Sequence, residues 1–148
     1  MAYEINLKLN DDWKTNLETY TDEVGVTTHL EAHLPGAPGE PDQILIDVYA
    51  GVLPDGETAE DQAFANYAEV IGFDEEDENE ESPIVKFKFN GKNAYGFEAE
   101  TEDGYPMRFF TQEVHKGVIL VVAYYVKSED QLLSTFELLE RNLRIPTK

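Results

Sequence analysis

The feature that most constrains this chain is a long apolar run followed at once by an amphipathic segment. Val118 to Val126 is an unbroken series of β-branched, aliphatic and aromatic residues, which is typical of a strand covered on both faces. Ser128 and Gln131 follow with the spacing of a capping box, which begins a helix. Apolar residues then recur at helical intervals, namely Leu132, Leu133, Phe136, Leu139 and Leu143. The sequence therefore predicts a central strand that leads into a helix packed back on the sheet.

Three more strands and one helix are predicted in the first half of the chain. Apolar and polar residues alternate from Tyr3 to Leu9 and again from Val24 to Leu34, whereas Ile44 to Ala50 is apolar on both faces except at Asp47. A helix is expected to begin at Thr58 and to end before Gly72. The segment from Pro35 to Pro41 is rich in helix and strand breakers, so we expect a surface loop there.

Three glycine-containing pairs punctuate the second half of the chain. Asn90-Gly91, Asp103-Gly104 and Lys116-Gly117 are each typical of a tight hairpin turn. They separate four strand-like runs, Ile84–Phe89, Lys92–Thr101, Tyr105–Val114 and Val118–Val126. This pattern predicts an antiparallel meander. The expected fold is one α+β domain over residues 1–148, with an antiparallel sheet of about six or seven strands and helices on its faces.

Charge and composition exclude several classes of function. The net charge of −20 repels phosphate backbones and anionic lipids, so binding to nucleic acid or to a membrane surface is not expected. The chain has no cysteine, which excludes disulfides, thiolate metal sites and cysteine nucleophiles. The N-terminus lacks the basic and apolar regions of a signal peptide, and we therefore expect a cytoplasmic protein.

His29, Glu31 and His33 form the most specific cluster of polar residues in the sequence. With a spacing of two, all three side chains leave the same face of a strand. Two imidazoles and a carboxylate are able to hold zinc or iron with open coordination positions. The alternative is that these residues are the polar half of an ordinary amphipathic strand, and both interpretations stay open at this point.

The sequence gives no basis for a catalytic site or a bound cofactor. None of the serines lies in a nucleophile motif, and glycine-rich phosphate loops are absent. The acidic segment Asp74–Glu81 fails as a calcium-binding loop, since Asn79 and Val85 stand where glycine and glutamate are required. We expect a solvated loop there, with binding of a basic partner as a further option. The chain is therefore predicted not to be an enzyme.

Aromatic residues on the meander strands suggest a surface that contacts another protein. Neighbours such as Phe109 and Phe110 point to opposite faces of a sheet, so either both faces are covered or one exposes an aromatic patch. Phe110, Tyr105 and Tyr125 are the candidate partner-binding residues. An exposed patch of this kind could receive an amphipathic helix or a second copy of the sheet, which would give a homodimer.

Several segments together resemble the PsbP-like superfamily, which includes the Mog-type proteins and bacterial branches of unassigned function. The matching segments are Tyr3–Trp13, Ala59–Ile71, the hairpin Phe87–Tyr95, and an ending in which the apolar strand is followed by Ser128-Glu-Asp-Gln131 and a helix that closes on Leu143-Arg-Ile145. The resemblance implies an antiparallel sheet with helices on both sides. It also implies binding to other macromolecules, and one bacterial branch looks like the adaptor chaperones of type VI secretion.

Two functions are therefore predicted. The first is a non-catalytic protein-binding or adaptor role, with a protein partner and no cofactor. The alternative is binding of a small ligand or a metal, with weak enzymatic activity as an option, at the strand face that carries His29, Glu31 and His33.

Overall fold

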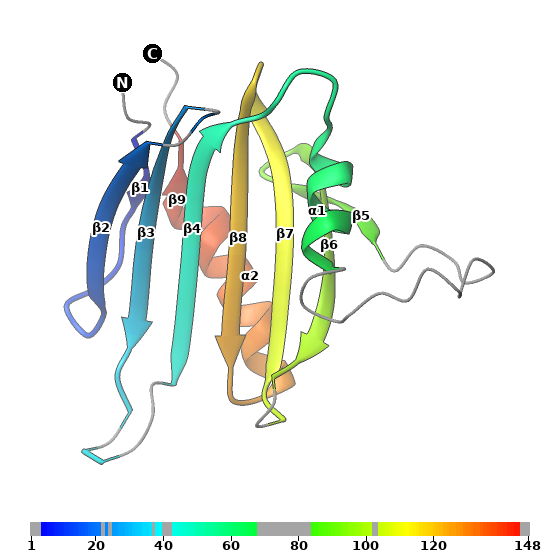
Figure 1. Ribbon diagram of the computed structural model, residues 1–148. Helices are drawn as coiled ribbons and strands as arrows, with labels where there is room; N and C mark the ends of the chain where they lie inside the picture. The colour runs from blue at the N-terminus through cyan, green and yellow to red at the C-terminus, as the bar shows by residue number, and fades with distance from the viewer. Residues whose placement is uncertain are drawn as a thin grey trace.

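A computed structural model gives the fold of the protein and describes residues 4–21, 23, 25–36, 38–39, 43–67, 84–101 and 104–145. The strands are β1 (Asn6–Leu7), β2 (Lys14–Thr21), β3 (Val26–Leu34), β4 (Ile44–Val52), β5 (Val85–Phe89), β6 (Lys92–Glu100), β7 (Pro106–His115), β8 (Val118–Val126) and β9 (Leu143–Arg144). The helices are α1 (Ala59–Tyr67) and α2 (Glu129–Asn142). Seven strands form one antiparallel sheet in the order β2-β3-β4-β8-β7-β6-β5, and β1 pairs separately with β9 (Figure 1).

The apolar run Val118–Val126, which was predicted to be a central strand, forms β8 at the centre of this sheet. β8 pairs with β4 on one side and with β7 on the other. The helix that follows, α2, packs behind the sheet, and α1 lies on the opposite face (Figure 1). Just before α2, the backbone N–H groups of Lys127 and Ser128 donate to Gln131 Oε1, at distances of 2.8 Å and 3.1 Å. The predicted α+β architecture, with helices on both faces of an antiparallel sheet, is confirmed.

The meander was also predicted correctly, and its turns explain why. Asn90 and Gly91 have φ values of 52° and 83°, the left-handed conformation that a two-residue hairpin turn requires. Gly117 has a φ of 77° at the β7–β8 turn. The β5, β6, β7 and β8 strands accordingly begin and end within about two residues of the predicted limits.

The N-terminal part differs from the prediction in two ways. The strand expected from Tyr3 to Leu9 is reduced to the two residues of β1, because Ile5, Leu7 and Leu9 pack against the core without joining the main sheet. The second difference is β2, a complete strand that the sequence pattern did not reveal. All eight of its residues are exposed, so it lacks the alternation of apolar and polar residues that marks a half-buried strand.

The main core lies between the sheet and α2. Its members are buried side chains from six strands of the main sheet, from β9 and from α2, and the largest of them include Tyr124, Phe89, Phe110, Ile46 and Leu139. Leu133, which the helical pattern placed on the apolar stripe, is 61% exposed. A smaller core lies under α1 and includes Ala63, Phe97, Met107 and Phe109. No helix within the described residues is long and apolar enough to cross a membrane.

Burial of Tyr124 in the main core predicts a loss of stability at alkaline pH. Desolvation raises the pKa of the Tyr124 phenol from 10.0 to about 12, although the nearby Arg108 opposes this shift. The folded chain therefore keeps the proton when the unfolded chain loses it, and the free energy of unfolding falls as the pH rises from 10 towards 12.

A Tyr124→Phe variant tests this assignment. We expect the wild type to lose about 2–3 kcal/mol more than the variant over that pH interval, as measured by urea unfolding below pH 10 and near pH 12. The variant also serves as the control for the deprotonation of lysines, which destabilises both proteins. Equal losses in the two proteins would contradict the assignment.

Candidate functional site

One face of the sheet is covered by a helix over only part of its width. α1 packs on β6 and β7, and α2 packs on the other face. Figure 1 shows α1 in front of the β6–β7 half, whereas β2, β3 and β4 carry no helix on that side among the described residues. Side chains that point to this side from these strands are therefore not covered by a helix of the described part of the chain.

The strand register decides which side chains share this face. His29 lies opposite Tyr49, and Glu31 lies opposite Asp47. In an antiparallel pair, residues directly opposite each other point to the same side of the sheet. The β3–β4 pair therefore places an imidazole, a phenol and two carboxylates side by side on the open face.

Contacts with its neighbours fix the position of the His29 ring. His29 Nε2 lies 2.9 Å from Asp47 Oδ1, and the two side chains are 16% and 18% exposed. The His29 ring stacks on the Tyr49 ring with 4.2 Å between centroids and 4° between planes. Stacking holds the imidazole plane, and the contact with Asp47 directs Nε2 towards the carboxylates.

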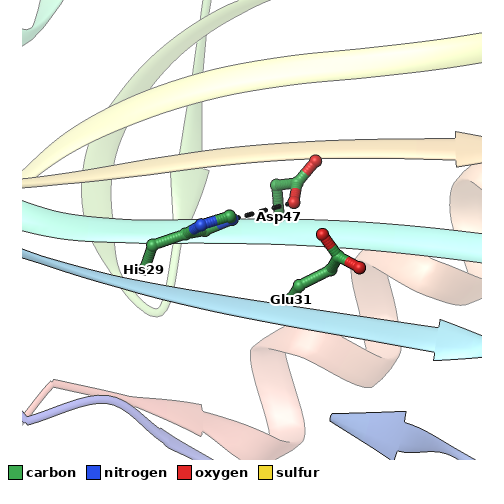
Figure 2. A group of neighbouring side chains, drawn as sticks. All are labelled: His29, Glu31 and Asp47. Atoms are coloured by element: carbon green, nitrogen blue, oxygen red, sulfur yellow. Dashed lines mark hydrogen bonds and ion pairs between the residues drawn. The ribbon is translucent and has the colours of Figure 1, made fainter. Parts of the chain in front are cut away.

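Glu31 completes a group of three possible metal ligands. One ligand atom from each of His29, Glu31 and Asp47 lies within 4.8 Å of the other two (Figure 2). His33 lies on the same face, opposite Lys14 on β2 and Leu45 on β4. It is not part of this group. The structure thus brings together two of the three metal ligands predicted from the sequence and adds Asp47 to them.

A cleft of about 370 Å³ lies next to this cluster, between α1 and the open strands. Its apolar floor comes mainly from β7 and β8, through Met107, Phe109, Ile119, Val121 and Ala123. Its rim is polar and consists of Tyr20, Thr27, Asp47, Tyr49, Asn66 and Tyr125. We call this space the α1-side cleft. Asp47 belongs both to the cleft and to the cluster with His29 and Glu31.

Tyr49 and Tyr125 on the rim keep their protons at neutral pH. Desolvation by burial and, second, the charge of Asp47 raise the pKa of Tyr49 above its ordinary value of 10.0. The same two causes act in the same direction on Tyr125. Both phenols therefore remain neutral hydrogen-bond donors beside a carboxylate that accepts hydrogen bonds.

The three predicted partner-binding residues lie in different environments. Phe110 has no exposed surface, because its ring is in the core between the sheet and α2, and it is therefore removed from any contact surface. Tyr105 is 37% exposed, with the Lys127 ammonium 4.3 Å from its ring centroid. Tyr125 lines the α1-side cleft. These side chains do not form one patch.

A second groove, of about 420 Å³, lies on the α2 face beside β5. It is lined by Val85, Phe87, Lys88, Gly96, Phe97, Glu98, Arg108, Leu133 and Phe136. Arg108 is already engaged there, since it pairs with Glu98 and lies 5.6 Å from the Phe136 ring centroid. Two of the charged groups of this groove, Arg108 and Glu98, therefore interact with each other.

Sequence reasoning missed several residues of the site. Asp47 was visible as the polar exception within β4, but its partner across the strands was not. Tyr20 was missed together with its strand, β2. The acidic segment Asp74–Glu81 lies outside the described residues, so its predicted role as a solvated or partner-binding loop stays a prediction.

Comparisons with known proteins bear on the fold alone. The sequence matches no protein-family profile, and no curated protein matches it. A crystal structure of a protein from Bacteroides thetaiotaomicron VPI-5482 is similar, with a TM-score of 0.57 and 10% identity. The match covers 97% of this chain and 46% of that one, so this chain spans less than half of the matched structure. Membership of the PsbP-like superfamily stays a prediction.

Proposed function

We propose that the protein binds a small, mainly apolar molecule in the α1-side cleft. The observation that carries the proposal is an apolar floor surrounded by polar groups from four strands and a helix. Binding sites for small molecules typically combine such a floor with a few polar groups that fix the orientation of the ligand. The volume of about 370 Å³ is within the range of such sites.

Charge on the rim indicates which polar end the molecule carries. Asp47 is the acidic side chain among the residues that line the cleft, and Glu31 lies opposite it on β3. Tyr20, Tyr49 and Tyr125 add aromatic faces and hydroxyl groups on the same rim. A carboxylate flanked by aromatic rings favours an ammonium or another hydrogen-bond donor over an anion. The proposed ligand class is therefore an apolar or aromatic body with an amine-like end.

Three probes of similar size test this class: 2-phenylethylamine, 2-phenylethanol and phenylacetate. Binding is followed through amide chemical shifts in proton–nitrogen NMR spectra, which report weak binding and its location at once. We expect the amine to bind most tightly, with a dissociation constant on the order of 1 mM, and the carboxylate most weakly. Shifts are expected on β4 and β8, which form the rim and the floor.

A matched pair of variants tests the location. Val121 lines the cleft, whereas Val85 is 61% exposed and lines the groove on the other face. We expect Val121→Trp to fill the cleft and to weaken binding of the amine by about tenfold or more, and Val85→Trp to leave it unchanged. Equal effects of both variants, or shifts confined to the α2 face, would contradict the proposal.

The adaptor function predicted from the sequence has less support from the residues that carried it. Phe110 is buried, and Tyr125 is part of the cleft. Binding of a protein partner therefore remains a separate hypothesis, and a pull-down at moderate salt with mass spectrometry of the captured proteins tests it. A stoichiometric partner whose binding survives Val121→Trp would place that function outside the cleft.

A further inference from the structure

We infer that His29, Glu31 and Asp47 bind one divalent first-row transition-metal ion at the edge of the α1-side cleft. The inference goes beyond the proposed function, because it concerns an ion held by β3 and β4 and does not require a ligand in the cleft. It rests on the geometry of the three side chains, on the charge arrangement of the two strands, and on the chemistry of the donor atoms.

The distances fit a metal site after small movements of the side chains. Zinc and similar ions lie about 2.1 Å from nitrogen and oxygen ligands, so two ligands at right angles are about 3 Å apart. His29 Nε2 and Asp47 Oδ1 are 2.9 Å apart, which corresponds to one edge of such a polyhedron. No two of the three ligand atoms are more than 4.8 Å apart, and ligands on opposite sides of an ion are about 4.2 Å apart.

Electrostatics favours a cation between the two carboxylates. Glu31 and Asp47 lie directly opposite each other on β3 and β4, and both are partly buried. Like charges in this position destabilise an antiparallel pair, and the net charge of −20 adds to the repulsion. His29 supplies at most one positive charge when it is protonated. A divalent ion would neutralise both carboxylates and leave the imidazole neutral as a ligand.

The donor set indicates the kind of ion. Calcium and magnesium prefer sites made of oxygen ligands, whereas an imidazole nitrogen suits zinc, iron, cobalt or nickel. Three protein ligands leave at least one coordination position for water or another molecule. Because Asp47 also lines the cleft, an ion bound here would compete with the amine end of a cleft ligand for this carboxylate.

Titration with Co²⁺ and with Zn²⁺ at physiological salt tests the inference. Calorimetry gives the stoichiometry, and the visible absorption of Co²⁺ reports a nitrogen-containing site directly. We expect one ion per chain, and a loss of affinity of about tenfold or more in His29→Ala. His33→Ala is the matched control, because His33 is on the same strand and the same face but outside the group of three. Its affinity should equal that of the wild type.

Glu31→Gln gives a second readout that does not depend on the metal. This variant should weaken Co²⁺ binding, and it should raise the melting temperature of the metal-free protein, since it removes the like-charge pair with Asp47. If His29 and Asp47 only pair with each other and hold no metal ion, Co²⁺ should not give the visible absorption of a nitrogen-containing site.

Three results would contradict the inference. The inference is wrong if Co²⁺ binding is absent, if His29→Ala leaves it unchanged, or if Mg²⁺ competes on equal terms, which would indicate diffuse binding by the acidic residues. Val121→Trp fills the cleft without changing these ligands, so it should retain Co²⁺ binding. Failure of this inference and failure of the proposed function are therefore distinguishable.

Discussion

Replacing Gly96 with alanine is expected to lower the free energy of unfolding by about 3 kcal/mol or more. Gly96 is a buried residue of β6 and lies opposite Phe110 on β7. A Cβ atom added there would lie 2.1 Å from the Phe109 carbonyl oxygen and 2.9 Å from Phe110 Cα. Because both are backbone atoms, relief requires the two strands to move apart, and rotation of a side chain is not enough.

A loss of stability on replacing glycine with alanine is unusual within a strand. Glycine within a strand is normally less stable than alanine by up to about 1 kcal/mol, so the general trend predicts a gain. Urea unfolding and thermal melting measure the change, and a loss of 3 kcal/mol corresponds to a decrease of about 6–12 °C in melting temperature.

Gly56→Ala is the control for that substitution. Gly56 has a φ of +83° with nothing within 4 Å of an added Cβ, so its cost is limited to the strain of the left-handed conformation, about 1–2 kcal/mol. A Gly96→Ala variant as stable as Gly56→Ala, or more stable, would show that β6 and β7 are not packed as closely as described.

The C-terminal half of the fold was predictable because its signals are local. Asn90-Gly91 and Lys116-Gly117 specify tight turns through backbone conformation alone, and each turn fixes the ends of two strands. The start of α2 is specified in the same way by Ser128 and Gln131. The antiparallel meander then follows from turn chemistry.

β2 was missed because its place in the sheet depends on a distant segment. The strand runs along one edge of the sheet, pairs with β3 alone among the described strands, and has side chains that are exposed on both faces. Its hydrogen bonds to β3 are made by the backbone, which leaves no pattern in the side chains. A sequence rule based on burial has nothing to detect at such an edge.

The candidate site was half predictable for a related reason. His29 and Glu31 share a face through the two-residue period of one strand, and this follows from the sequence. Asp47 joins them through the register between β3 and β4, which is fixed by packing along the whole strand pair. The same period also placed His33 on this face, yet a strand rises about 3.3 Å per residue, so its Cα lies about 13 Å from that of His29.

The second large loss of stability is expected when Phe110 is replaced, and replacing its neighbour Phe109 should have a different effect. The Phe110 ring has no exposed surface and lies 4.9, 5.6 and 6.1 Å from the ring centroids of Phe89, Phe87 and Phe136. Removing it leaves a closed cavity in the main core. We expect Phe110→Ala to lower the free energy of unfolding by about 3–5 kcal/mol. Phe110→Leu, which keeps most of the volume, should lose clearly less.

Phe109 points to the other face, where it stacks on Phe97 at 5.1 Å and forms part of the floor of the α1-side cleft. The space left by Phe109→Ala opens into the cleft, so water can enter it, and the loss of stability should be smaller than at Phe110. The same change removes part of the surface on which the aromatic probe would lie, and binding of 2-phenylethylamine should weaken. Urea unfolding and NMR titration of both variants separate the two roles.

If the two alanine variants lose stability equally, or if Phe110→Leu weakens binding of the probe while Phe109→Ala does not, the assignment of the two faces is wrong. In that case the cleft would have to be sought on the side of the sheet that faces α2.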